Sequence, residues 1–218
     1  MSARDDILAA VRAGLGGPRV DADLVRREAA SLLDNLGSTR PTLKPVALAD
    51  AFAERVTSPK VAATTVDRIA SAADLPAAVS RYLEGRRLRS AITLQPAAEL
   101  KSLDWSGFEL HEALATDDAV GVGIARWGIA ETGSLVFHSG ADTPILANFL
   151  PLHHLVLVRA QTIVAYLEDY VAAASATGER PPRNVNIITG ASGTTDIEGS
   201  LVLGAHGPRY LHVIVAVA

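Results

Sequence analysis

Glu131 is the residue of this sequence whose surroundings point most directly to chemistry. It is followed by Thr132 and Gly133, and β-rich segments at 119–124 and 134–138 flank it. This order predicts a carboxylate at a turn between two buried strands. A charge among apolar side chains incurs a large desolvation cost unless it faces a cleft or a hydrogen-bond partner. Glu131 could therefore act as a general base or as a nucleophile that forms an acyl intermediate. Alternatively, it accepts hydrogen bonds from the amides of its own turn.

A second candidate is the glycine-containing segment 187–198, which reads IITGASGTTDIE. It predicts a strand, a loop and the start of a helix, an order in which free backbone amides can hold an anion. The segment lacks the Gly-Lys-Ser/Thr ending of a P-loop and the spacing of a dinucleotide-binding fingerprint. The predicted contacts to an anionic substrate are Gly190, Ser192, Gly193 and Thr194.

Two acids in the same segment allow other interpretations. Asp196 would suit the dipole of the expected helix but would repel an anion. Thr195 and Glu198 have the spacing of a capping box, which is a structural role. If this loop meets Glu131 across a cleft, Asp196 becomes a second catalytic candidate, because neighbouring carboxylates change one another's affinity for protons.

The histidines are weaker candidates for functional residues than Glu131 and the glycine-containing segment. His154, in the pair His153-His154, and His206 fall where loops at strand ends could converge, so both join the predicted substrate-binding residues. His138 and His212 are better explained as hydrogen-bonded structural residues. The His-Glu-x-x-His spacing of helical zinc sites is absent, so a metal site would need distant residues, and we predict none.

Arginines near the motif centred on Glu131 suggest a carboxylate ligand. Arg126, together with Thr132 and Gly133, completes the predicted binding set, and Arg159 follows a later apolar strand. A guanidinium can hold a carboxylate through paired hydrogen bonds. Either arginine could instead be a surface charge or a buried partner of Glu131.

The composition excludes several classes of protein. Of 218 residues, 49% are hydrophobic and 20% charged, which is typical of a globular domain. The 20 basic and 24 acidic residues are interspersed without a basic stripe, so nucleic acid is not an expected partner. The chain has no cysteine, which removes thiolate nucleophiles, disulfides and self-ligated iron–sulfur clusters.

The chain is expected to be cytoplasmic and without a membrane span. Acidic residues stand where a signal peptide would carry basic ones. The most hydrophobic stretch, 145–158, is interrupted by Pro151 and two histidines and falls short of the ~20 apolar residues that a spanning helix needs.

The elements that must position these residues begin with two amphipathic helices, at 4–15 and 23–36, followed by a turn-rich linker at 38–45 and a short helix at 47–56. We therefore expect an N-terminal helical extension and linker over 1–57 and an α/β domain over 58–218. In that domain, expected strands at 61–65, 90–94, 119–124, 134–138, 155–159, 185–188 and 210–217 alternate with helices at 74–85, 96–103 and 162–174. This alternation predicts an α/β fold with a mainly parallel sheet flanked by helices.

Four ordered motifs resemble those of the lactate utilization protein C family, the LUD domain. They are GIAETGSLV at 128–136, LPLHHL at 150–155, TGASGTTDIE at 189–198 and LGAHGP at 203–208. The resemblance covers about residues 60–218. It implies a fold like that of the group containing CoA transferases, ribose-5-phosphate isomerase (RpiA) and glucosamine-phosphate deaminase (NagB). It also implies a role in oxidising L-lactate to pyruvate beside iron–sulfur partner proteins that would carry the clusters.

One position departs from the family pattern. Members of the family often have arginine after the loop serine, where this chain has Gly193, so an expected anion contact would have to come from Arg126 or Arg159. Three hypotheses remain open at this point. The chain could be a component of a lactate-oxidising system that binds a small carboxylate or cofactor. It could be a stand-alone enzyme of the CoA-transferase-like or sugar-phosphate isomerase-like kind that uses Glu131. It could also be a regulatory or scaffold domain without chemistry.

Overall fold

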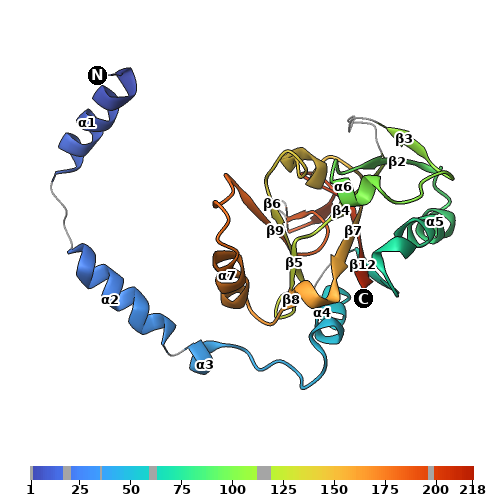
Figure 1. Cartoon of the computed structure of the whole chain (residues 1–218), viewed down its shortest axis with the longest axis horizontal. Coiled ribbons are helices and arrows are strands. Elements are labelled where there is room, and N and C mark those ends of the chain that lie inside the picture. The colour runs from blue at the N-terminus through green and yellow to red at the C-terminus, as the bar shows by residue number, and fades with distance from the viewer. Residues whose placement is uncertain (1, 17–20, 35, 59–62, 112–118, 196–198) are drawn as a thin grey trace. The chain divides into compact units, whose positions relative to one another are not determined.

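The chain divides into two compact units, residues 1–42 and 43–218, in a computed structural model that describes residues 2–16, 21–34, 36–58, 63–111, 119–195 and 199–218 (Figure 1). The division comes earlier than the boundary predicted after residue 57. The reason is the helix α4 (Leu48–Val56), whose Phe52 and Val56 are buried in the core of the second unit.

The first unit contains the helices α1 (Ala3–Leu15), α2 (Ala22–Leu33) and α3 (Leu36–Thr39). Ser2 begins α1 in a capping box, in which its Oγ accepts from the amide of Asp5 at 3.3 Å and its own amide donates to the Asp5 carboxylate at 3.0 Å. The apolar side chains of α1, among them Ile7 and Leu15, are exposed. The two amphipathic helices predicted from the sequence are confirmed.

A six-stranded parallel sheet forms the centre of the second unit. Its strand order is β1 (Thr64–Ile69), β12 (Tyr210–Ala216), β7 (His153–Arg159), β4 (Val120–Ile124), β2 (Ala91–Leu94) and β3 (Glu109–His111). Every neighbouring pair in this order is parallel. The predicted α/β class with a mainly parallel sheet is therefore confirmed.

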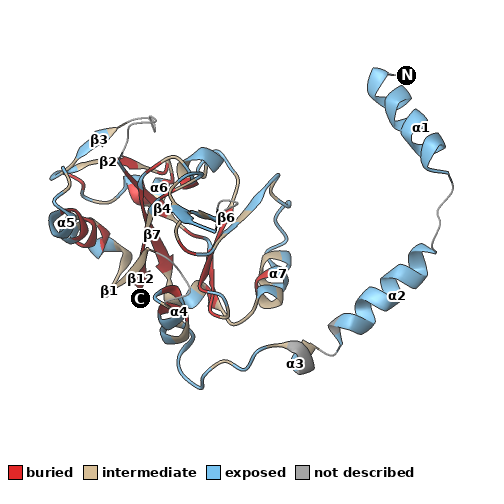
Figure 2. Ribbon diagram, turned by 180° about the vertical axis from the view of Figure 1, so that it is seen from behind, coloured by how far each residue is buried: buried red, intermediate tan, exposed pale blue. Residues whose placement is uncertain are grey.

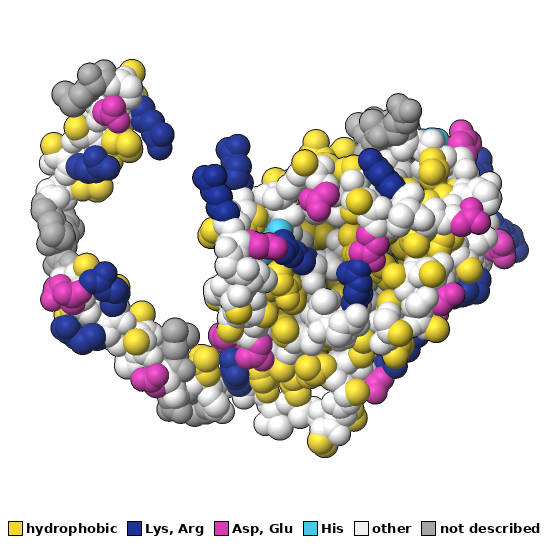
Figure 3. All heavy atoms as spheres, in the orientation of Figure 1, with side chains coloured by type: hydrophobic (Ala, Val, Ile, Leu, Met, Phe, Trp, Pro, Cys, Tyr) yellow, Lys and Arg dark blue, Asp and Glu magenta, His cyan; other side chains and the backbone are white. Residues whose placement is uncertain are grey.

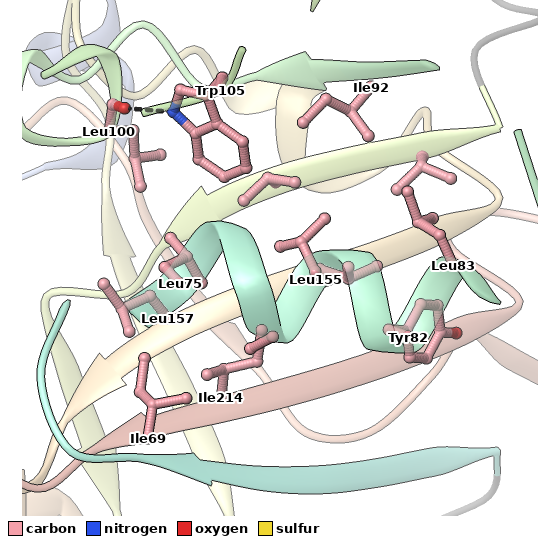
Figure 4. Packing of buried hydrophobic residues seen from close by; sticks show 14 of the residues in the cluster. Ile69, Leu75, Tyr82, Leu83, Ile92, Leu100, Trp105, Leu155, Leu157 and Ile214 are labelled. Atoms are coloured by element: carbon pink, nitrogen blue, oxygen red, sulfur yellow. Dashed lines mark hydrogen bonds between the residues drawn. The ribbon is translucent and has the colours of Figure 1, made fainter. Parts of the chain in front are cut away.

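Helix α5 (Leu75–Arg86), preceded by the short 3₁₀ helix η1 (Ala72–Asp74), covers one face of this sheet. Figure 4 shows its Leu75 and Leu83 facing a layer of apolar side chains from the central strands, including Leu155, Leu157 and Ile214. Trp105 closes the layer beyond α6 (Ala98–Lys101), and its indole N–H donates to the carbonyl of Leu100 at 2.7 Å.

A second, four-stranded sheet covers the other face. Its order is β8 (Ile163–Val164), β5 (Trp127–Ile129), β6 (Ser134–His138) and β9 (Val185–Ile188). Leu135 and Phe137 of β6 pack in one cluster with Val156 and Val213 of the large sheet. The outer side of the small sheet carries α7 (Leu167–Ala176), whose Tyr170 packs against Trp127. Helices thus flank a pair of sheets, and the buried residues concentrate where the sheets meet (Figure 2).

Three local predictions need correction. The glycine loop leads into a strand, β10 (Gly193–Thr195), which pairs antiparallel with β11 (Leu201–Leu203), where a helix start was expected. Strand β7 begins at His153, so the paired histidines belong to the strand. The helix expected over 162–174 begins only at Leu167, after the 3₁₀ helix η3 (Ala160–Thr162), because Ile163 and Val164 pair with β5.

The surface and the helices add two observations. On the face shown in Figure 3, basic and acidic side chains are interspersed among apolar ones. Within the described ranges, the helices are all too short or too polar to cross a membrane.

Gly133 gives a test of how α4 packs on the small sheet. Its φ is +72°, and a Cβ there would lie 2.9 Å from the backbone nitrogen of Val56. Gly133→Ala should therefore lower the free energy of unfolding by about 1–3 kcal/mol, measured by urea denaturation. The matched control is Gly85→Ala, in the open last turn of α5. It should raise stability by roughly 0.5–1 kcal/mol. Equal effects of the two substitutions would contradict this packing.

Candidate functional site

Glu131 lies at the turn of the hairpin that β5 and β6 form. The predicted turn is confirmed, but the strand before it is β5, whereas the predicted strand at 119–124 is β4 of the large sheet. Its amide donates to the carbonyl of Ala165 at 3.0 Å, and the amide of Gly133 donates to the carbonyl of Ile129 at 2.9 Å. The Glu131 side chain is half-buried and lines neither of the two cavities described below. Its catalytic role stays a prediction that this geometry does not strengthen.

A chain of hydroxyl groups joins this hairpin to the glycine loop. Thr132 Oγ1 is 2.6 Å from Ser134 Oγ, which is 2.5 Å from Thr189 Oγ1. The contact follows from sheet pairing, since Leu135 of β6 lies opposite Ile188 of β9. The structure thus brings together two of the predicted motifs through Ser134.

The glycine loop meets the His206 turn. Thr194 Oγ1 lies 2.9 Å from His206 Nδ1, and the amide of Ser192 donates to the carbonyl of Pro208 at 2.8 Å. Gly190 has a φ of +79° and is buried, and Gly193 pairs with Leu203 in the β10–β11 hairpin. The Ser192 amide is already bonded and is therefore not free to hold an anion, while the predicted anion contacts of Gly190, Gly193 and Thr194 stay a prediction. Asp196 and Glu198 lie outside the described residues, so their predicted roles stay untested.

The first cavity, which we call the His154 cavity, has a volume of about 770 Å³. Thr93, Gly121 and His154 form a row across β2, β4 and β7, because Thr93 lies opposite Gly121 and Gly121 lies opposite His154. Trp105, Leu146 and Leu150 contribute apolar wall. Leu146 belongs to the 3₁₀ helix η2 (Ile145–Asn148).

His154 is buried between the two sheets. Its ring stacks on Phe137 of β6 with 5.8 Å between ring centroids, and its Nδ1 has no hydrogen-bond partner in the described part of the chain. Burial without a compensating charge lowers its pKa to about 4, so the ring is neutral at neutral pH. His153 points to the opposite face, where its Nδ1 lies 2.9 Å from the Tyr82 hydroxyl.

The second cavity, which we call the arginine cavity, has a volume of about 630 Å³. It lies at the carboxyl ends of the adjacent strands β4 and β7, the end of a parallel sheet where ligands bind. Arg126, Arg159 and Arg180 line it. The Arg126 guanidinium forms an ion pair with Glu179 and lies 5.0 Å from the centroid of the Trp127 ring. Arg159 forms an ion pair with Glu99.

His138 also lines the arginine cavity. Its Nε2 lies 2.8 Å from the Tyr170 hydroxyl, and its ring centroid is 5.0 Å from that of Trp127. Burial, and then the positive charge of Arg126, lower the pKa of His138. A negatively charged ligand bound beside Arg126 would raise the pKa of His138.

Gln95 lines both cavities. Its Nε2 donates to Thr143 Oγ1 at 3.0 Å, and its Oε1 accepts from the amide of Ile124 at 3.0 Å. Sequence reasoning missed Gln95, Trp127 and Arg180. The available signal for Gln95 was a polar residue directly after the apolar strand at 91–94, which is the ligand-binding end of a parallel strand.

The predicted site residues therefore separate into three places. Arg126 lies in the arginine cavity, His154 lies in the His154 cavity, and the hydroxyl chain and glycine loop hold Thr132, Ser192, Thr194 and His206. No group of three or more histidine, aspartate or glutamate side chains is placed to hold a metal ion among the residues described.

A family model for the LUD domain matches residues 51–216. The chain belongs to the LUD domain family. The match confirms the resemblance found in the four motifs and includes both cavities and the part of α4 from residue 51 onward.

Curated relatives of this LUD domain chain include lactate utilization protein C of Deinococcus radiodurans, which is 36% identical over 66% of this chain and 70% of that protein. An uncharacterized protein, YkgG of Escherichia coli, is 40% identical over 41% of this chain and 40% of its own length. Lactate utilization protein C of Halalkalibacterium halodurans is 32% identical over 44% of each chain. The chain thus spans less than half the length of the last two relatives.

A solved structure has the same fold. The crystal structure of a DUF162 family protein from Deinococcus radiodurans superposes with a TM-score of 0.54 at 28% sequence identity, over 79% of this chain and 99% of that one. The likeness supports the two-sheet arrangement that places the cavities of this LUD domain.

Buried histidines should make this LUD domain sensitive to acid. His212, whose Nδ1 lies 2.8 Å from Thr65 Oγ1, has a pKa lowered by burial to about 4, like that of His154. Since both values are depressed in the folded state, the unfolded chain binds more protons between pH 6.5 and 4. Stability should be full above pH 6.5 and fall towards pH 4, by up to roughly 3 kcal/mol for each ring.

Urea denaturation from pH 4 to 8 measures this loss. His212→Phe should make the dependence on pH shallower, because it removes one of the two buried rings whose pKa is lowered. A flat profile for the unsubstituted protein would contradict the assignment of neutral buried rings.

Proposed function

We propose that this chain is a component of an L-lactate utilization system, that it binds a small carboxylate in the arginine cavity, and that it works beside iron–sulfur partner proteins. Membership of the LUD domain family and the names of curated relatives support the role in lactate utilization. The arginine cavity is the observation that supports the binding of a small carboxylate.

The three arginines that line this cavity favour the binding of a small anion. Arg126, Arg159 and Arg180 supply planar groups that can donate paired hydrogen bonds to a carboxylate. Arg180 has no hydrogen bond or ion pair within the described residues, whereas the other two are held by Glu179 and Glu99. The arginines paired with these two acids are fixed in place, and Arg180 is available to a ligand.

The redox cofactor is proposed to lie on a partner. Oxidation of lactate to pyruvate releases electrons and protons, and the chain has no cysteine to ligate an iron–sulfur cluster through thiolates. The neutral ring of His138, beside Arg126, is a group in this cavity that can accept a proton once an anion is bound.

Carboxylate binding is tested with L-lactate and pyruvate as probes. Either probe should change the fluorescence of Trp127 in a Trp105→Phe background and raise the pKa of His138, followed by NMR, because an anion offsets the charge of Arg126. Arg180→Gln should weaken binding about tenfold or more. The control, Arg89→Gln, removes an exposed arginine outside the cavity and should bind as the unsubstituted protein does. Equal weakening by both substitutions would indicate non-specific attraction and contradict the site.

The role in lactate utilization is tested genetically. Deletion of the gene should abolish growth on L-lactate as sole carbon source and leave growth on pyruvate intact, because the defect would lie before pyruvate. Complementation with the unsubstituted gene should restore growth, and the Arg180→Gln gene should restore it less well. Undiminished growth of the deletion strain on L-lactate would refute the proposed function.

A further inference from the structure

We infer that the His154 cavity is a second ligand site, which takes a mostly apolar compound whose uncharged hydroxyl or carbonyl group hydrogen-bonds His154. This inference is independent of the proposed carboxylate site. It rests on the place of His154 in the lining of the cavity, on an imidazole without a hydrogen-bond partner and on the mostly apolar wall.

Glycines in β4 let neighbouring side chains lie close against the strand at the base of the cavity. A Cβ at Gly123 would lie 3.0 Å from Gln95 Oε1 and 3.1 Å from His154 Nε2. A Cβ at Gly121 would lie 2.8 Å from Pro151 Cγ. Both distances to Gly123 are too short for an ordinary contact, so the polar ends of Gln95 and His154 approach the strand where side chains are missing.

His154 is one of the polar groups that approach the strand there. Its side chain is 2% exposed and it lines the cavity. Its Nδ1 is fully buried without a hydrogen-bond partner, and Nε2, the nitrogen that approaches Gly123, has no hydrogen-bond partner among the described residues either. A ligand hydroxyl or carbonyl on Nε2 would give the imidazole a partner, since each nitrogen of a neutral ring is either a donor or an acceptor.

The wall of the cavity is mostly apolar. Trp105, Pro144, Leu146 and Leu150 present apolar surface, while Lys101, which is exposed, and His111, which is half-buried, add basic groups. A cavity of about 770 Å³ with this balance falls within the range of small-molecule sites. The ligand class is therefore a mostly apolar compound whose group at His154 is an uncharged hydroxyl or carbonyl, because a charge beside the buried imidazole would be desolvated without a partner.

The two tryptophans separate this site from the arginine cavity. Trp105 lines the His154 cavity and Trp127 lines the arginine cavity, and the chain has no other tryptophan. We would titrate 1-naphthol into the full ¹⁵N-labelled chain and follow both indole N–H signals. Saturable movement of the Trp105 signal, with the Trp127 signal unmoved, is expected. Ala147→Phe, which places a ring into the cavity from η2, should weaken binding at least tenfold.

The part played by His154 is tested by comparing 1-naphthol with naphthalene, which lacks the hydroxyl. The unsubstituted protein should bind 1-naphthol about tenfold more tightly, because only the hydroxyl can pair with the imidazole. His154→Leu should remove this preference while naphthalene still binds. If His154→Leu does not fold, Ala147→Phe still decides whether the cavity is the site.

Three results would overturn the inference. They are a Trp105 signal that does not saturate, 1-naphthol binding that Ala147→Phe leaves unchanged, and an equal affinity of the unsubstituted protein for both probes. None of them bears on L-lactate or pyruvate binding, which is read at Trp127.

Discussion

The packing of the small sheet on the large one is the interaction on which the rest of the molecule depends. Phe137 and Leu135 of β6 are buried against Val156 and Val213, so one face of the parallel sheet is covered by a second sheet together with α4. Close packing of these apolar side chains fixes the position of one sheet on the other. Residues of β2, β4 and β7 line the His154 cavity, and the arginine cavity lies at the carboxyl ends of β4 and β7.

Polar side chains that line these cavities are held by different means. Gln95 is hydrogen-bonded at both ends of its amide, through the amide of Ile124 and the hydroxyl of Thr143, and it lines both cavities. His154 lacks such a partner at Nδ1. The arginine cavity keeps its charges near solvent, with Arg126 and Arg159 paired to acids, while the His154 cavity is mostly apolar. One fold thus presents two adjoining sites of opposite chemical character.

Family membership and geometry contribute different parts of the functional argument. The LUD domain match and the relatives named lactate utilization protein C support a metabolic context. They do not identify a ligand, and the shared fold alone is no guide to one. The arginines at the carboxyl ends of β4 and β7 are the basis of the proposed carboxylate ligand, and the placement of the iron–sulfur clusters on partner proteins is part of the same proposal. Glu131, the first candidate from the sequence, lies apart from both cavities.

The sequence by itself determined the longer strands, most of the helices, the parallel sheet and the family, because these follow from local periodicity and from motifs read in order. It also placed Glu131 at a turn. Only the tertiary structure decided that a second sheet covers the first, that the glycine loop enters a hairpin, and that Gln95, Trp127 and Arg180 line cavities. The physical reason is that these outcomes depend on long-range pairing, such as Leu135 with Ile188, which local preferences do not encode.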